Sequence, residues 1–132
     1  MPLVIVEKNG PVKTVTLNRP EKRNALNDEL LGGLADAFTE TPSEDERVAV
    51  IRAAGPVFCS GMDLRQRKES LGRPASIVDS LRAIENYPLP VVGVVQGHAI
   101  AGGNEIALHC DFVVASTKAN FGMSLSQIGL AP

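Results

Sequence analysis

VVGVVQGHAIAGGNEIALHCDFVVA, residues 91–115, is the stretch that decides the fold. Residues 91–95 are apolar on both alternating faces, a pattern that predicts a strand covered on both sides, as in parallel sheets with crossover helices. The glycine-rich segment that follows leads into a helix predicted over residues 102–109, and residues 112–115 predict the next strand. The stretch therefore predicts a strand–helix–strand unit of an α/β protein.

Strands and helices also alternate through the preceding part of the chain. Further strands are predicted at residues 3–7, 14–17 and 48–53. The first two flank Lys8-Asn9-Gly10-Pro11, whose turn residues predict a hairpin. One helix is predicted to begin at its cap residue Asn27, and a second to span residues 76–87 before Pro88.

The chain contains no repeat of fixed period and no interdomain linker. Residues 61–74, rich in Arg, Lys and Gly, predict a mobile surface loop. Because no other composition break occurs, we expect residues 1–132 to belong to one domain.

Composition excludes several classes of protein. With 132 residues and 14.0 kDa the chain has the size of one domain, and its net charge of −2 lacks the basic excess of nucleic-acid binding. The first residues lack the basic start and long apolar stretch of a signal peptide, and no apolar run approaches the length of a membrane span. We therefore expect a soluble, cytoplasmic protein that binds neither nucleic acid nor membranes.

Two segments carry candidate chemistry: FCSGMDL at residues 58–64 and GHAIAGGNE at residues 97–105. A loop amide near Met62 and the first amides of a helix that starts near Gly102 would bind one oxyanion, because helix N-termini present free N–H groups and a partial positive charge. The same residues also suit a tight strand-to-helix turn and a gap-filling core methionine. A phosphate-binding P-loop is improbable, because Gly103-Asn104 stand where Lys and Ser/Thr are needed.

With these segments, the chain resembles the enoyl-CoA hydratase/isomerase family, also called the crotonase superfamily. The resemblance runs from about Asn18 to Pro132 and rests on motifs in the family's order, which are NRP (18–20), NAL (24–26), FCSGMDL (58–64), GHAIAGGNEIALHCD (97–111), FG (121–122) and GLAP (129–132). It implies an α/β fold, a crotonase-like spiral of β-β-α units. Because members of the family are commonly about twice as long, it also implies a partial domain that lacks the C-terminal helical trimerisation region.

The resemblance assigns catalytic roles as well. The backbone N–H groups of Met62 and Gly102 would hold the thioester carbonyl of a coenzyme A substrate and stabilise its enolate. Glu105 aligns with one of two glutamates that orient water and shuttle its proton, although a glutamate in a first helical turn also serves simply as a dipole partner. The position of the other glutamate holds Leu125, so two-carboxylate hydration is not carried over intact, whereas isomerisation, hydrolysis or other enolate chemistry stays compatible.

A further set of residues is implied at the coenzyme A side of the site. Arg23 would meet its phosphates, since arginine binds phosphate oxygens bidentately, although charges in a loop are usually just solvated. The remaining residues of this set are Ala25, Ser60, Asp63, Leu64 and Arg65. Coenzyme A is part of the substrate, so no separate cofactor is expected. The cysteines, Cys59 and Cys110, lack metal-binding spacing and are interpreted as buried free thiols.

Two functions stay open at this point. The first is a hydratase- or isomerase-like protein that acts on acyl-CoA or enoyl-CoA thioesters through a backbone oxyanion hole, and the family implies a homo-oligomer, a trimer or hexamer. The second is a non-catalytic fragment or pseudoenzyme that only binds CoA esters or makes oligomer contacts. Leu125 and the expected lack of the C-terminal helices favour the second.

Overall fold

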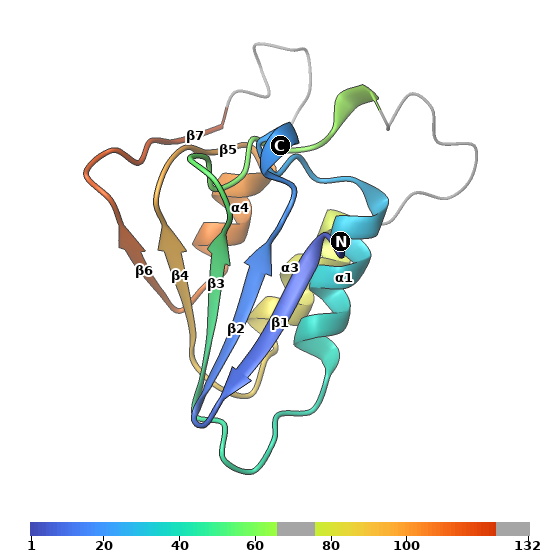
Figure 1. The fold of residues 1–132 in the computed structure, drawn as a ribbon, viewed down its shortest axis with the longest axis vertical. Coiled ribbons are helices and arrows are strands. Elements are labelled where there is room, and N and C mark those ends of the chain that lie inside the picture. Colours follow the sequence, from blue (N-terminus) through green and yellow to red (C-terminus); the bar gives the residue numbers. More distant parts are fainter. Residues whose placement is uncertain (66–75, 124–132) are drawn as a thin grey trace.

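The computed structural model describes residues 1–65 and 76–123 (Figure 1). Its main element is a five-stranded sheet whose strands are, in spatial order, β1 (Val4–Asn9), β2 (Val12–Leu17), β3 (Val48–Ala53), β4 (Val91–Val95) and β6 (Phe112–Ala115). β1 and β2 form an antiparallel hairpin, while β2, β3, β4 and β6 run parallel to one another. The predicted α/β class is confirmed.

The hairpin is tighter than the sequence predicted. Asn9 pairs directly with Val12, so Lys8 and Asn9 belong to β1 and only Gly10 and Pro11 make the turn. Gly10 has a φ of 58°, in the left-handed region that glycine enters without steric cost. A two-residue turn with glycine first matches the twist of the flanking strands, and this preference outweighs the turn tendency of residue 9.

Three α-helices connect the parallel strands within the described residues: α1 (Asp28–Thr39), α3 (Ile77–Glu85) and α4 (Gly102–Leu108). Asn27 caps α1 as predicted, because its Oδ1 accepts the N–H of Leu30 at 2.9 Å. The Ser76 hydroxyl accepts the N–H of Val78 at 3.1 Å and starts α3. The structure also describes a short 3-10 helix, η1 (Pro20–Lys22), and two short paired strands, β5 (Ala99–Ile100) and β7 (Phe121–Gly122).

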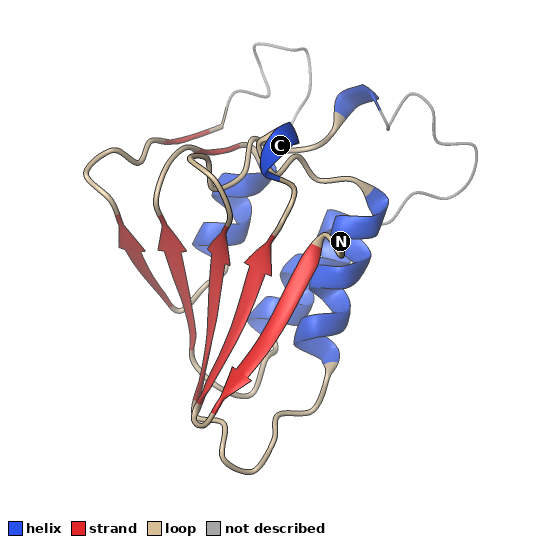
Figure 2. Cartoon of the chain, in the orientation of Figure 1, coloured by secondary structure: helices blue, strands red, loops and turns tan. Residues whose placement is uncertain are grey.

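All three helices cover one face of the sheet (Figure 2). Each connection steps to the next parallel strand in the same direction, and right-handed crossovers then place every helix on the same side. The core between the layers contains buried residues of the strands and helices, among them Val15, Leu17, Ile51, Val91, Val95, Leu30, Leu34, Phe38, Leu81 and Ile84.

β4 departs from the prediction that both of its faces would be covered. Val91 and Val95 are fully buried on the helix side, but Val94 is 37 % exposed and Val92 is only half-buried on the other. Since the described helices lie on a single face of the sheet, the expectation of burial on both sides is wrong for the part of the chain that the structure describes.

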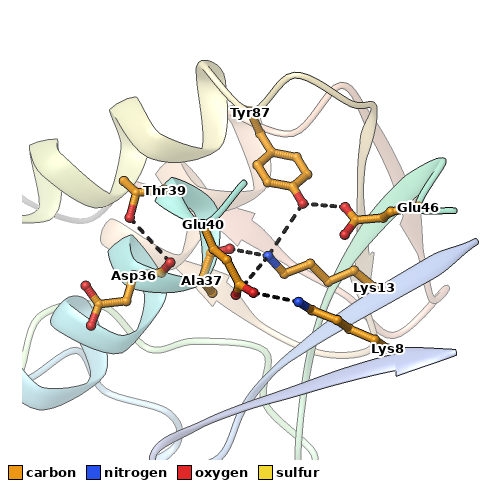
Figure 3. A network of polar contacts seen from close by, with 8 residues as sticks. All are labelled: Lys8, Lys13, Asp36, Ala37, Thr39, Glu40, Glu46 and Tyr87. Atoms are coloured by element: carbon orange, nitrogen blue, oxygen red, sulfur yellow. Dashed lines mark hydrogen bonds and ion pairs between the residues drawn. The ribbon is translucent and has the colours of Figure 1, made fainter. Parts of the chain in front are cut away.

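A polar network closes the end of the sheet at which the parallel strands begin (Figure 3). Lys13, 1 % exposed, donates to the carbonyl of Ala37, and its Nζ lies 3.8 Å from Glu40 Oε2 and 5.1 Å from the centroid of the Tyr87 ring. The Tyr87 hydroxyl in turn donates to Glu46. Burial lowers the pKa of Lys13, and the surrounding carboxylates and aromatic face offset the cost of a buried cation.

Several predictions lie outside the described residues. They concern the mobile loop beyond residue 65, the segment with Leu125, and the final GLAP motif.

Candidate active site

Three loops meet at the edge of the sheet where the parallel strands end (Figure 1). β2, β3 and β4 are followed by residues 18–26, 54–63 and 96–101, and parallel strands bring their carboxyl ends to one edge. Ligands of open α/β sheets bind outside this edge. Both motif segments singled out in the sequence therefore lie where a ligand is expected.

The first motif segment packs directly on the second. The N–H of Ile100 donates to the carbonyl of Cys59 at 3.0 Å. A Cβ added at Gly103 would lie 2.3 Å from that same carbonyl oxygen, and one added at Gly97 would lie 1.9 Å from the carbonyl oxygen of Pro56. These two glycines are thus required for close packing, which was the alternative reading of the glycine motif.

Met62 is held by the loop that follows β2. It forms an isolated parallel bridge with Leu26. The N–H of Leu26 donates to the Gly61 carbonyl at 2.8 Å, and the N–H of Asp63 donates to the Leu26 carbonyl at 2.9 Å. Hydrogen bonds on both sides of Met62 therefore fix the orientation of its own peptide groups.

The amides of Met62 and Gly102 come from adjoining backbone. A Cβ added at Gly61 would lie only 3.6 Å from the nitrogen of Gly102, so the peptide that leads to Met62 rests against the start of α4. Within residues 1–65 and 76–123, neither N–H donates a hydrogen bond to a protein group. Two such donors on neighbouring backbone have the chemistry of an oxyanion-binding site.

The residue before Gly102 is strained. Ala101 has φ 51° and ψ −113°, a conformation that costs a residue with a Cβ roughly 1–3 kcal/mol. Its N–H donates to the Gly122 carbonyl at 2.7 Å, and its carbonyl accepts the N–H of Glu105 at 3.0 Å. The strain is therefore held in place by β7 on one side and by the first turn of α4 on the other.

Glu105 lies in the first turn of α4, three residues after Gly102, and is half-buried. In the described part of the chain, its carboxylate makes no hydrogen bond or ion pair, while its carbonyl lies 2.8 Å from His109 Nδ1. The carboxylate is thus not engaged in a polar contact within the described residues, and its catalytic role stays a prediction.

The residues predicted to contact coenzyme A lie at the same edge. Arg23 has an exposed side chain and a φ of 53°, and its carbonyl accepts the N–H of Ser60 at 3.1 Å. Ala25 is half-buried, Leu64 is 44 % exposed and the Arg65 side chain is exposed. Their contacts with a ligand stay predictions.

Sequence reasoning assigned no role to Arg19 and Asn24, although both lie in quoted motifs. Arg19 Nη1 donates to Asp63 Oδ2 at 2.9 Å. Asn24 is fully buried, and its amide nitrogen donates to the carbonyls of Ala54 and Val57, both at 2.9 Å. The usable signal in the sequence was the residue type, because asparagine tolerates the left-handed conformation that Asn24 adopts, with φ 54°, and bonds to nearby backbone.

Both cysteines are free thiols, as predicted, and Cys59 is buried. The prediction that Cys110 is buried is wrong, because this side chain is only half-buried. Desolvation raises the pKa of each to about 12, so both stay protonated at neutral pH. The described residues contain no group of three or more His, Cys, Asp or Glu side chains placed to hold a metal ion. None of the helices that the structure describes is both long and apolar enough to cross a bilayer.

Comparison with known proteins identifies the family. The family model Enoyl-CoA hydratase/isomerase matches residues 7–132. A probable enoyl-CoA hydratase of Mycobacterium leprae is 37 % identical over an alignment of 124 residues, which covers 91 % of this chain and 50 % of the relative. The chain therefore spans about half the length of this relative.

Solved structures agree in fold. An enoyl-CoA hydratase from Mycobacterium avium subsp. paratuberculosis superposes with a TM-score of 0.88 at 37 % identity, over 100 % of this chain and 54 % of that one. A protein described as an enoyl-CoA hydratase from Thermobifida fusca, in complex with acetoacetyl-CoA, superposes with a TM-score of 0.86 at 28 % identity. The match covers 99 % of this chain and 57 % of that one. The fold, the order of the motifs and these matches together show that the chain belongs to the enoyl-CoA hydratase/isomerase, or crotonase, family.

Proposed function

We propose that the chain binds an acyl-CoA or enoyl-CoA thioester and stabilises its enolate with the backbone N–H groups of Met62 and Gly102. The observation that carries the proposal is a pair of amide donors on adjoining backbone at the carboxyl edge of the sheet, neither of which has an acceptor among residues 1–65 and 76–123. Membership of the family supports the substrate class, as does the acetoacetyl-CoA bound to the Thermobifida fusca relative. We place the protein in the cytoplasm.

Glu105 is the proposed proton carrier. Its carboxylate takes a proton from the α- or γ-carbon of the thioester, the resulting negative charge gathers on the thioester oxygen between the two amides, and the proton returns to the same or another carbon. Leucine at position 125 supplies no second acid, so this sequence favours isomerisation and proton exchange over the addition of water.

Calorimetry with acetoacetyl-CoA and with free coenzyme A tests the oxyanion site. The keto form of acetoacetyl-CoA has no carbon–carbon double bond to hydrate. It differs from coenzyme A by an acetoacetyl group, which includes the thioester carbonyl that the two amides address. Tighter binding of the thioester supports the proposal. Equal affinities would remove the oxyanion site while leaving coenzyme A binding possible.

A second candidate function, non-catalytic binding of CoA esters or oligomer contact, is favoured by one surface. Leu108, Phe112 and Val114 are 69 %, 64 % and 61 % exposed, around an edge strand without a charged residue. Open apolar edge strands favour association with another chain, and we propose that this surface supports a homo-oligomer. Light scattering should find self-association that Val114→Lys reduces, whereas a compact wild-type monomer at high concentration would contradict it.

A further inference from the structure

Arg19 links two of the three loops at the site. Its guanidinium Nη1 donates to the Ala25 carbonyl at 3.0 Å and to Asp63 Oδ2 at 2.9 Å. The side chains of Arg19 and Asp63 are only 14 % and 17 % exposed, so solvent screens this ion pair less than a surface pair. The contact joins the loop after β2 to the loop after β3.

Asp63 follows Met62 directly. Its N–H donates to the Leu26 carbonyl at 2.9 Å, and its Oδ1 accepts the N–H of Arg65 at 3.1 Å. Rotation of the peptide group between residues 61 and 62 would therefore disturb the hydrogen bonds to Leu26 or move the Asp63 carboxylate that Arg19 holds. Both contacts thus help to set the direction of the Met62 N–H.

Arg19 is itself fixed by Asn24. The N–H of Arg19 donates to Asn24 Oδ1 at 2.8 Å, and its carbonyl accepts the N–H of Asn24 at 2.9 Å. The buried Asn24 amide is bound in turn to the backbone at the end of β3, through the carbonyls of Ala54 and Val57. The backbone of Arg19 is thus fixed by hydrogen bonds, so its guanidinium group is suited to hold a second loop in place.

We propose that the Arg19–Asp63 ion pair is a positioning device that sets the orientation of the Met62 N–H and thereby determines the preference for a thioester carbonyl over free coenzyme A. Arg19 acts through Asp63 and is a positioning residue. This inference rests on the proposed oxyanion site, and it adds to that site a residue to which sequence reasoning gave no role.

The test measures the ratio of the dissociation constants of coenzyme A and acetoacetyl-CoA, together with the melting temperature. Asp63→Asn keeps the shape and the backbone bond to Leu26 but removes the charge. Because a hydrogen bond between charged groups typically contributes more than a neutral one, we expect the affinity for acetoacetyl-CoA to fall roughly tenfold more than the affinity for coenzyme A, so that the ratio falls by that factor. Arg19→Lys keeps the charge without the planar fork and should give a smaller fall.

Two further variants complete the design. Lys8→Gln removes the 2.6 Å ion pair between Lys8 and Glu40 at the far end of the sheet, and it should leave the ratio unchanged. The double variant Arg19→Gln/Asp63→Asn removes both charges of the 2.9 Å pair together, so neither Arg19 nor Asp63 is left charged without the other. If the two residues act as a pair, its ratio should equal that of Asp63→Asn.

Each outcome decides between the two proposals. A wild-type preference for the thioester that survives in Asp63→Asn and in the double variant overturns the positioning role alone. Equal losses of both affinities, with a lower melting temperature, show a purely structural role and also overturn it. Absence of any preference in the wild type removes the oxyanion site and the positioning role with it.

Discussion

Gly103→Ala tests whether the two motif segments must touch. The added Cβ would lie 2.3 Å from the Cys59 carbonyl oxygen, whereas real Cβ contacts stay beyond 3.0 Å, so the backbone has to move by at least about 0.7 Å. Overpacking of this kind costs roughly 3 kcal/mol of unfolding free energy, because backbone cannot rotate away as a side chain does. For a chain of 132 residues this lowers the melting temperature by roughly 10 °C.

Thermal unfolding followed by circular dichroism measures the effect, with Gly32→Ala as the matched control. Apart from its chain neighbours and the backbone of its own helix, no atom of the described residues lies within 4 Å of a Cβ added at Gly32, inside α1. Alanine is favoured over glycine there by about 1 kcal/mol, and the melting temperature should rise by roughly 3 °C. Gly103→Ala should also lose the thioester preference, because the displacement separates the amides of Met62 and Gly102. A melting temperature at or above that of the wild type, beside the expected rise in Gly32→Ala, would refute the close packing.

Three other predictions concern chemistry, strain and pH. Glu105→Gln should slow the exchange of acyl-CoA protons with solvent, measured by NMR, by about 10²–10⁴-fold. Leu125→Glu should confer hydratase activity if the second acid is the only group that is lacking. Ala101→Gly should raise the free energy of unfolding by about 1 kcal/mol in urea titrations, since glycine adopts φ 51° without strain; a loss would contradict the strain at that residue. Burial raises the pKa of Cys59 and Cys110 from 9.0 to about 12, so their stabilising contribution is complete below pH 9 and is lost as the pH rises toward 12. Urea titrations at about pH 8 and about pH 11 should show this fall in the free energy of unfolding, and the fall should be smaller in Cys110→Ser. An equal fall in wild type and Cys110→Ser would contradict the contribution of Cys110.

The sequence predicted those parts of the fold that local chemistry controls. Asn27 caps α1 as predicted, because its side chain reaches a nearby N–H group, and the strand at residues 48–53 was predicted with its observed bounds. The helix predicted over residues 76–87 is shorter in the structure, where it spans Ile77–Glu85. The open face of β4 was not predictable. The sequence of a strand shows that both of its faces are apolar, but it does not show which parts of the chain pack against each face. Gly10 and Pro11 form the turn alone, since pairing across the hairpin outweighs the local preference of Asn9.

At the site, the sequence identified the two loops but not what holds them. Met62 and Gly102 were found because a motif marks them, and the structure places their amides on adjoining backbone. Arg19 and Asn24 act through contacts with residues about thirty to forty-five positions away, on another loop. Such contacts depend on which strands become neighbours, a property of the whole sheet that no local pattern contains.

The parallel arrangement of β2, β3 and β4 has a consequence for the order of folding. Val15 pairs with Ile51 and Ile51 with Gly93, so every loop of the site is anchored on a strand whose partner is distant in the chain. Pairings of this kind carry a large loop-closure entropy and form late. The two amides consequently acquire their geometry only when β2, β3 and β4 have paired. A thioester that binds them stabilises the native state alone, by about 2.7 kcal/mol at a hundredfold excess over its dissociation constant, so its effect on melting reports the assembly of these three strands.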